Sequence, residues 1–272
     1  MQMNDPAGSV PFDLVAYLRR IGYAGELSPS RATLDALHRA HATSIPFENL
    51  DILLGVPIRL DLPSLQAKLV AGRRGGYCFE QNALFASALE HLGFAVTRLA
   101  ARVRYRSDRV LPRTHMALRV DVDGARLLVD VGFGAEGLLL PVPLDGVESP
   151  QFAWTYRVID EGGGAHLLQS RRGDGWEDLY GFTHEPQLPV DYEIANYYTS
   201  THPASRFTQM LTAQRIAPDV RRLLRDREYV EDRGATSDTR TIDSTELLTV
   251  LEQKFGLVFP AGTRFDRGRG AA

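Results

Sequence analysis

The sequence contains a single cysteine, Cys78, among 272 residues. One cysteine excludes an internal disulfide and any metal site built from several thiolates, so we expect no bound metal. Lysine is also nearly absent, because 31 residues are basic and only Lys68 and Lys254 among them are lysines. We attribute this bias to genome composition rather than to a binding surface.

Long apolar runs and an excess of positive charge are missing too. No stretch of about 18 apolar residues is present to cross a bilayer, and residues 1–6 lack the basic start and apolar core of a secretory signal. The net charge of -3 and the isoelectric point near 6.2 argue against nucleic acid as the main partner. We therefore expect a cytoplasmic protein that binds neither nucleic acid nor a membrane.

Cys78 lies where a turn becomes a helix. Residues 74–82 read RGGYCFEQN, and apolar residues recur at helical spacing from Cys78 to Leu92 before Gly93. The first turn of a helix favours an anion, and Arg73 or Arg74 would add to that effect, so the position favours a reactive thiolate. Taken alone, a lone cysteine is more often a small buried hydrophobic side chain than a reactive thiol.

The first third of the chain has helical periodicity and is predicted to form an α-helical bundle. Ser28 is the predicted N-cap of its second helix, with Pro29 at the first helical position. A break is expected at residues 45–50. Helices are predicted over residues 12–21, 63–72 and 78–92, and a further helix is predicted to begin at residue 29.

After Gly93 the hydrophobic period changes to two, which is typical of β-strands. We predict an antiparallel sheet or barrel of about six strands, at 94–105, 114–122, 125–131, 152–159, 165–171 and 176–182.

The last third of the chain gives a weaker signal. Residues 183–205 read as a connector with a short helix at 192–198, and the pattern of 207–242 fits either strands or a helix. Asp243 and Glu246 resemble a capping box for a final helix that Gly256 ends. We expect the tail at 264–272 to be disordered.

The hairpin around Asp123-Gly124 has a register that can be worked out from its loop. If these two residues form the turn, Asp121 faces Arg126 as a favourable pair of opposite charges. The same register places His115 opposite Gly132, with Asp130 two residues away on the same face. Diagonal neighbours on one face lie about 7 to 8 Å apart at the backbone, so an imidazole and a carboxylate can meet there.

A histidine held by a carboxylate is a suitable base for a cysteine nucleophile. The carboxylate fixes the tautomer and leaves the second ring nitrogen to take the thiol proton. The spacing does not establish that Cys78 reaches the same point, and His115 and Asp130 also fit the polar face of a sheet. The run 131–134 reads VGFG, whose glycines would let a ligand approach the backbone beside Phe133, although this pattern alone favours a simple turn.

Several segments together resemble the arylamine N-acetyltransferases, in the same order and over about residues 12–265. They are residues 46–50 (PFENL), 74–82 (RGGYCFEQN), 114–116 (THM), 129–134 (VDVGFG), 196–198 (NYY) and 200–207 (STHPASRF). The resemblance implies an α+β fold with a cysteine-protease-like triad arrangement. It implies an N-terminal helical bundle (1–93), a central antiparallel β-barrel with its connector (94–205), and a C-terminal α/β lid (206–272) in which 207–242 is mostly strands.

The resemblance also implies an activity and the residues that carry it. Cys78 would be the acetyl-carrying nucleophile, His115 its base and Asp130 the residue that orients the base. The acceptor pocket would include Phe133 and Phe207, and Thr114 and Gly134 would lie along acetyl-coenzyme A, a co-substrate rather than a tightly bound cofactor. The expected reaction is a two-step (ping-pong) acetyl transfer to an arylamine, arylhydrazine or arylhydroxylamine, typical of xenobiotic metabolism. A homodimer is left open.

Three other functions fit the same residues. Cysteine peptidases and transglutaminase-like enzymes use the same triad order, which makes a hydrolase the main alternative. An amide synthase acting on an aryl amine is a closer relative of the expected enzyme. A ligand-binding protein with an inert buried cysteine is the third.

Overall fold

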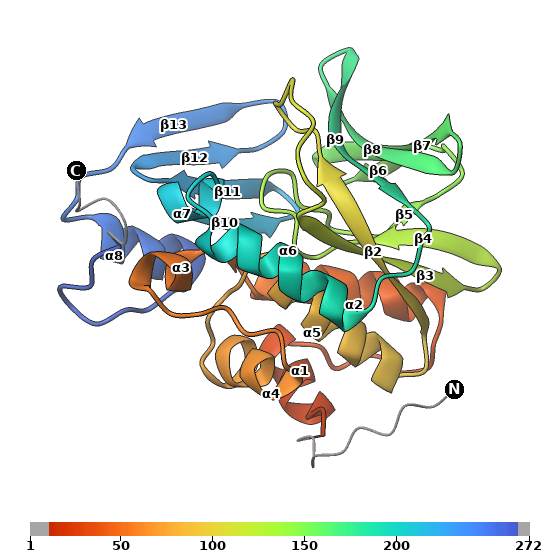
Figure 1. The fold of residues 1–272 in the computed structure, drawn as a ribbon, viewed down its shortest axis with the longest axis horizontal. Helices are drawn as coiled ribbons and strands as arrows, with labels where there is room; N and C mark the ends of the chain where they lie inside the picture. Colours follow the sequence, from red (N-terminus) through yellow and green to blue (C-terminus); the bar gives the residue numbers. More distant parts are fainter. Residues whose placement is uncertain (1–10, 266–272) are drawn as a thin grey trace.

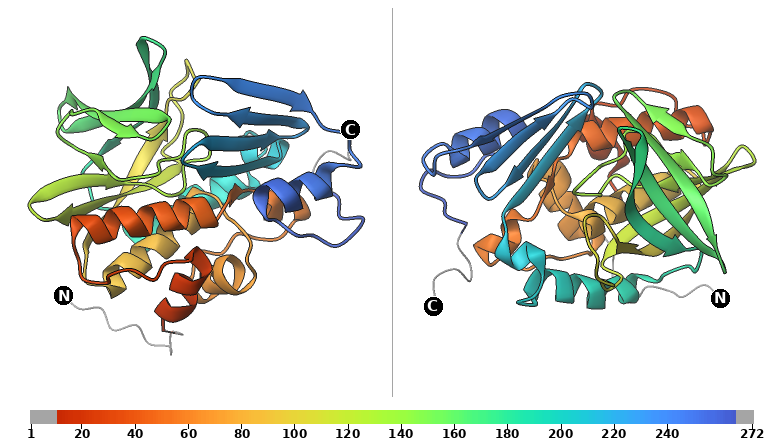
Figure 2. Two further views of the ribbon diagram at one scale, coloured as in Figure 1. Left: turned by 180° about the vertical axis from the view of Figure 1, so that it is seen from behind. Right: turned by 90° about the horizontal axis from the view of Figure 1, so that it is seen from above.

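Two antiparallel sheets lie side by side above the helices of the first third of the chain (Figure 1). The computed structural model describes residues 11–265. Helix α5 (Cys78–His91) packs against β2 and β3 of the larger sheet, and α2 (Arg31–Ser44) packs against β10 of the smaller one. The view from above shows the two sheets inclined to each other, with the helices beneath both (Figure 2).

The predicted helical bundle is present. Asp13 caps α1, and Gly22 ends it in the left-handed region at φ 67°. The predicted cap of the second helix is wrong, because Ser30 rather than Ser28 accepts a hydrogen bond from the Thr33 amide. The bundle consists of α1 (Leu14–Ile21), α2, α3 (Leu50–Leu54), α4 (Leu62–Leu65), its π-helical continuation η1 (Gln66–Ala71), and α5.

The predicted break at 45–50 contains a short strand, β1 (Phe47–Glu48), and the start of α3. This strand pairs with β10, more than 160 residues later in the chain, through Phe47 and Gln214. A strand of two residues is too short to show the alternation that reveals strands, so β1 could not be predicted from the sequence.

The larger sheet has eight strands in the order β5-β4-β3-β2-β9-β8-β7-β6. Strand β5 also contacts β7, so the curved sheet is nearly closed, and the predicted α+β fold with an antiparallel barrel is confirmed. All predicted strands are present, whereas β5 and β6 were missed because they are only two and three residues long. The strands are β2 (Ala95–Val103), β3 (His115–Val122), β4 (Ala125–Val129), β5 (Val142–Pro143), β6 (Ser149–Gln151), β7 (Trp154–Gly162), β8 (Ala165–Arg172) and β9 (Gly175–Thr183).

The predicted register of the β3–β4 hairpin is confirmed along the strands. Asp121 pairs with Arg126, and the ladder runs to the pair Leu118 and Val129. It ends there, so the predicted pairing of His115 with Gly132 is wrong, and His115 pairs with Ala101 of β2 instead. The chain after Val129 leaves the sheet and carries Asp130 toward α5.

The smaller sheet has the order β1-β10-β11-β12-β13, which confirms that 207–242 is mostly strands. The connector contains a longer helix than predicted, α6 (Pro189–Thr201), which crosses in front of both sheets in Figure 1. The remaining elements are α7 (Arg206–Gln209), β10 (Thr212–Ala217), β11 (Val220–Arg225), β12 (Glu228–Asp232), β13 (Ser237–Thr241), α8 (Leu247–Val250) and the π-helix η2 (Leu251–Phe255).

The end of the described chain is ordered by side-chain contacts. The Asp243 amide donates a hydrogen bond to the Glu246 carboxylate at 2.8 Å, but α8 begins at Leu247 with Glu246 as its N-cap, so the predicted capping box is wrong. Gly256 ends η2 at φ 72°, as predicted. Phe265 packs against Phe259 with ring centroids 5.0 Å apart and is buried, so the predicted disorder is wrong at this residue. The rest of the predicted tail, 266–272, lies outside the described residues.

Two hydrophobic clusters form the core. The larger joins the helical bundle to the barrel, and the smaller fills the space between α3, the smaller sheet and the last helix. The predicted division into parts at residues 93 and 205 stays a prediction. Within residues 11–265 no helix combines the length and apolar character that crossing a membrane requires.

Candidate active site

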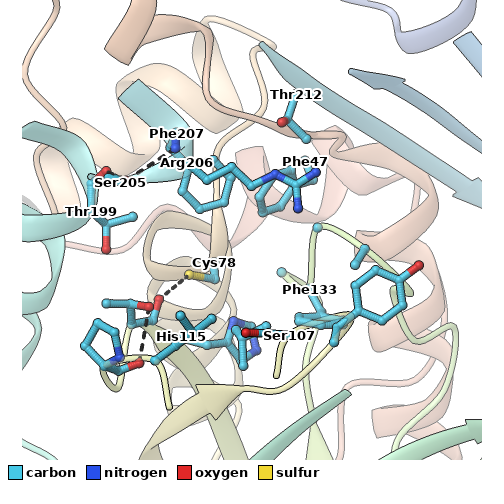
Figure 3. Close-up of a pocket in the computed structure, with 18 of the residues that line it drawn as sticks. Phe47, Cys78, Ser107, His115, Phe133, Thr199, Ser205, Arg206, Phe207 and Thr212 are labelled. Atoms are coloured by element: carbon cyan, nitrogen blue, oxygen red, sulfur yellow. Dashed lines mark hydrogen bonds between the residues drawn. The ribbon is translucent and has the colours of Figure 1, made fainter. Parts of the chain in front are cut away.

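A cavity of about 370 Å³ lies where α5, the barrel, α6 and the smaller sheet meet (Figure 3). Asp130 does not line it but lies directly behind His115, fully buried. The structure thus brings together every residue that was predicted for the site. Those that line the cavity are Cys78, Thr114, His115, Phe133, Gly134 and Phe207.

Cys78 is the first residue of α5, as predicted, and its side chain points into the cavity (Figure 3). The helix starts here because the Glu80 carboxylate accepts a hydrogen bond from the Tyr77 amide at 3.1 Å. The thiol donates weakly to the Thr114 carbonyl, with 3.7 Å between sulfur and oxygen. Only 4% of Cys78 is exposed, so its accessible surface faces the cavity.

Gly132 allows the chain after β4 to approach the start of α5. A Cβ atom at this position would lie 2.8 Å from the Cys78 Cα and 2.9 Å from the Asn82 side-chain nitrogen. No real side chain tolerates such distances. The glycine is therefore required for the backbone contact that brings the barrel's carboxylate to the helix that carries the thiol.

His115 and Asp130 form a buried pair. His115 Nε2 donates to Asp130 Oδ2 at 2.7 Å, which leaves Nδ1 as the ring nitrogen for the thiol of Cys78. Burial lowers the pKa of His115, but the Asp130 charge, the hydrogen bond to Asp130 and the interaction with Cys78 together raise it to about 10. Burial alone would raise the pKa of Asp130, but the His115 charge and the hydrogen bond to His115 outweigh that effect and lower it. The pair is therefore an imidazolium and a carboxylate at neutral pH.

Asp130 is held by two further side chains that the sequence reasoning missed. Asn82 donates to Asp130 Oδ1 at 2.9 Å, and the Tyr180 hydroxyl donates to Oδ2 at 2.8 Å. The Gly132 amide adds a third hydrogen bond at 2.8 Å. Asn82 lies four residues after Cys78, on the same helix face, and this spacing could have revealed it. Tyr180 gave no signal, because β9 reaches the site only through the order of the barrel strands.

Two buried histidines lie behind the site. The Asp130 amide donates to His38 Nε2 at 3.3 Å. His41 lies between the Tyr17 hydroxyl at 2.8 Å and the Gln81 side-chain oxygen at 2.7 Å. Burial lowers the pKa of His38 to about 4 and that of His41 to about 3, so both rings are neutral at pH 7. They support the site but carry no charge into it.

The prediction that Arg73 or Arg74 would assist the thiolate is wrong. Arg74 forms ion pairs with Glu48 at 2.7 Å and Asp51 at 2.9 Å, and Arg73 is exposed on the surface. Lys68 joins the same buried network through Asp51. The cation next to Cys78 is therefore the His115 imidazolium.

Aromatic rings form the apolar wall of the cavity. Phe133 packs edge-on against His115, with ring centroids 5.1 Å apart, and Phe47 packs against Phe207 at 5.9 Å. A side chain at Gly134 would overlap the Phe47 ring, so glycine allows this wall to form. Phe47, in the short strand β1, is a cavity residue that the sequence reasoning missed.

Comparison with known proteins gives a consistent result. The sequence profile of the N-acetyltransferase family matches residues 31–263. An arylamine N-acetyltransferase of Mycolicibacterium smegmatis is 44% identical over 90% of this chain and 92% of its own length. The human arylamine N-acetyltransferase 1 is 30% identical over 90% of this chain and 94% of its own.

Solved structures agree with the sequence relatives. The M. smegmatis arylamine N-acetyltransferase superposes with a TM-score of 0.88 at 41% identity, covering 94% of this chain and 96% of that one. The Mycobacterium marinum enzyme in complex with CoA gives 0.85 at 36% identity, covering 90% and 92%. The fold, the family profile and the relatives thus place the protein among the acetyltransferases. The chain belongs to the arylamine N-acetyltransferase family, and the prediction of an acetyl-coenzyme A dependent enzyme is confirmed.

Proposed function

We propose that the protein moves an acetyl group from acetyl-coenzyme A through a thioester on Cys78 to the nitrogen of an arylamine, arylhydrazine or arylhydroxylamine. The observation that carries this proposal is the convergence of Cys78 from α5 and His115 from β3 at one cavity, with Asp130, just after β4, hydrogen-bonded behind His115. Thiol, imidazole and carboxylate in this order form the activated-nucleophile arrangement of acyl transfer.

In the first step the Cys78 thiolate attacks the carbonyl carbon of the acetyl thioester. The bond between that carbon and the coenzyme sulfur breaks, and the departing thiolate takes the proton from the His115 imidazolium. The new bond is again a thioester, so little free energy is lost. Asp130, fixed by its hydrogen bonds, keeps the ring oriented in both protonation states.

In the second step the aromatic nitrogen attacks the acetyl group on Cys78. His115, now neutral, takes a proton from that nitrogen, and the Cys78 thiolate leaves, which restores the ion pair. Arylamines are largely unprotonated near neutral pH, so an apolar pocket can bind them without removing a charge from water. Phe133 and Phe207 are the proposed acceptor contacts, whereas Thr114 and Gly134 are the proposed contacts of the acyl donor.

Intact-mass measurement tests the covalent step. After addition of acetyl-coenzyme A, the wild-type protein should gain one acetyl group and the Cys78→Ala variant none. Adding an arylamine should remove the adduct and yield its amide, and initial rates at varied donor and acceptor should give parallel double-reciprocal lines. If the acetyl group is lost to water equally fast without the arylamine, the protein is a hydrolase and the proposal is wrong.

A further inference from the structure

A second groove, of about 830 Å³, lies between α2, strands β10 and β11, and η2. Figure 2 (left) shows α2 reaching the smaller sheet beside the C-terminal helix, in blue. Four cationic side chains line this groove and, among the described residues, no carboxylate does. We call it the basic groove, and its cations are Arg39 of α2, Arg215 of β10, Arg222 of β11 and Lys254 of η2. It shares no residue with the catalytic cavity, and the mechanism proposed above uses none of these side chains.

Two of the cations repel each other across the sheet. Arg215 and Arg222 lie directly opposite one another on β10 and β11. Opposed residues on one face of an antiparallel pair have Cβ atoms about 4.5 to 5.5 Å apart, and like charges in this position are destabilising. The next residue in the same row is Glu231 of β12, which pairs with Arg222 at 3.3 Å. On the other side of Arg215 the short strand β1 has already ended, so no neighbour supplies it with a carboxylate.

Arg215 has no partner among residues 11–265, where its side chain forms neither an ion pair nor a hydrogen bond. Its guanidinium lies beside the end of η2, with Nη1 3.5 Å from where a Cβ atom of Gly256 would be. Burial lowers the pKa of Arg215, and the Arg222 charge lowers it further. A half-buried guanidinium with five unused N–H donors is costly. Arg74 and Arg221, by contrast, are paired with buried carboxylates.

The other cations of the basic groove compete for one carboxylate. Arg222 and Lys254 contact the same oxygen, Oε1 of Glu231, at 3.3 Å and 3.9 Å. Arg39 is exposed and forms no ion pair within the described part of the chain. Asp35, which feels the charge of Arg39, is already paired at 2.7 Å with the first arginine of α2. Four positive charges are therefore set against a single carboxylate, which leaves an excess that an anion between them would stabilise.

We propose that the basic groove binds a small polyphosphate anion, with Arg215 and Arg222 holding one phosphate between them and Arg39 and Lys254 contacting a second. Guanidinium groups match phosphate oxygens in a bidentate manner, which would satisfy the unused donors of Arg215. A phosphate carries about 1.5 to 2 negative charges near pH 7, so two phosphates match the excess charge of the groove. The proposal does not depend on the function proposed above, because the groove and the catalytic cavity have no residue in common.

Two sources share this chemistry, a free polyphosphate and a nucleoside polyphosphate. Tyr23 and Ile216 also line the groove and offer apolar surface to the base of a nucleotide, which a free polyphosphate does not use. Calorimetric titration with sodium tripolyphosphate and with ATP distinguishes the two. Tighter binding of ATP identifies a nucleotide as the ligand, and equal binding identifies the polyphosphate chain alone.

Substitutions test whether the groove is the site of binding. In Arg215→Gln the Kd for tripolyphosphate should rise at least about tenfold. Arg215→Lys keeps the charge but loses the planar fork, and should give an intermediate Kd. Arg59→Gln is the control, because it removes an equal charge from a side chain that is 74% exposed and lies outside the groove, and it should bind as the wild type does. An unchanged Kd in Arg215→Gln would overturn the proposal.

The two lysines of the chain provide a test on the wild-type protein, which holds even if the variants do not fold. The Lys254 side chain is 40% exposed in the groove, whereas that of Lys68 is 16% exposed and pairs with Asp51 and Glu80. An N-hydroxysuccinimide ester should therefore modify Lys254 first. Tripolyphosphate at about ten times its Kd should slow this modification about tenfold, because the occupied fraction of the groove is protected. Peptide mass mapping measures each lysine separately.

Two results of the labelling experiment would contradict the proposal. If Lys254 reacts equally fast with and without tripolyphosphate, the anion binds elsewhere. A polyphosphate that only competes with acetyl-coenzyme A in the catalytic cavity would give this result. If NaCl at the same ionic strength protects Lys254 as well as tripolyphosphate does, the effect is screening of charge rather than binding. Neither outcome affects the acetyl adduct on Cys78, which tests the proposed function separately.

Discussion

His115 and Asp130 are joined by a 2.7 Å hydrogen bond and are almost completely buried, since their side chains are 3% and 0% exposed. The two residues come from the start of β3 and from the chain just after β4, the outer ends of one hairpin. Because the charge of one stabilises the charge of the other without competition from solvent, the pair sets the protonation state of the whole site.

The first prediction concerns Asp130→Asn. The amide keeps the shape but removes the charge that raises the pKa of His115, so burial makes the imidazole neutral near pH 7. Alkylation of Cys78 by iodoacetamide should then be slower at pH 6 than at pH 9, whereas in the wild type it should vary little until the imidazolium loses its proton near pH 10. We expect kcat/KM to fall about 10²- to 10⁴-fold.

Asp121→Asn is the matched control for this change. Asp121 lies on the same hairpin, but its side chain is 43% exposed and pairs with Arg119. It should retain the wild-type pH profile. An identical alkylation profile in Asp130→Asn would show that the buried carboxylate does not control the thiol.

The second prediction concerns Gly132→Ala. The added methyl group would meet the backbone of Cys78 at 2.8 Å, and backbone atoms cannot move aside cheaply. We expect a loss of about 1 to 3 kcal/mol in the free energy of unfolding, measured with urea, together with slower acetylation of Cys78. Gly175→Ala is the control, because its nearest neighbour would be the Arg172 carbonyl at an ordinary 3.8 Å. Equal stability of the two variants would contradict the close approach.

The third prediction concerns acid stability. Burial lowers the pKa of His38 from an ordinary 6.5 to about 4, so between these values the unfolded chain binds a proton that the folded protein does not. The contribution of neutral His38 is therefore complete above about pH 6.5 and is lost as the pH falls toward 4. For this residue alone, stability should drop by about 2 kcal/mol between pH 7 and pH 5.

His38→Gln isolates this contribution. Glutamine keeps an acceptor for the Asp130 amide but does not titrate, so the variant should show a shallower fall in the free energy of unfolding over the same pH range. Urea titrations at several pH values measure both slopes. Parallel slopes for wild type and variant would mean that His38 is not held neutral by burial.

The fourth prediction concerns the contact between the two sheets. Arg221 of β11 is 1% exposed, donates to the Tyr156 hydroxyl of the barrel at 2.7 Å, and lies 3.5 Å from the buried Glu136 carboxylate. Arg221→Met would leave Glu136 with the contact to Arg172 alone, and we expect a loss of about 3 to 5 kcal/mol in urea unfolding. Arg222→Met, next in the chain, removes a pair with Glu231 that is partly exposed, and should cost below about 1 kcal/mol.

A similar cost for both arginine variants would show that the buried pair does not hold the sheets together. The comparison is sharp because the two residues are adjacent on β11 and face opposite sides of the sheet. Melting temperatures of the two variants measure the difference directly.

The sequence by itself determined the local elements and one long-range pair. Helical spacing and Gly93 defined α5, and the Asp123-Gly124 loop predicted the hairpin register, because two-residue turns fix which residues face each other. The contact of His115 with Asp130 was predicted from that register, but it forms because the chain leaves the sheet after Val129, where the ladder ends. The chemistry of Cys78 followed from its place at a helix start, and the resemblance indicated that 207–242 is mostly strands.

Only the tertiary structure decided which distant residues complete the site. Tyr180 reaches Asp130 from β9, Phe47 enters the cavity through a strand of two residues, and Arg74 turns away from Cys78 toward Glu48. No local pattern encodes these contacts, because they depend on how the barrel closes and on which carboxylates are buried nearby. Turn chemistry and periodicity act within about ten residues, whereas burial and charge pairing are settled by the packing of the whole chain.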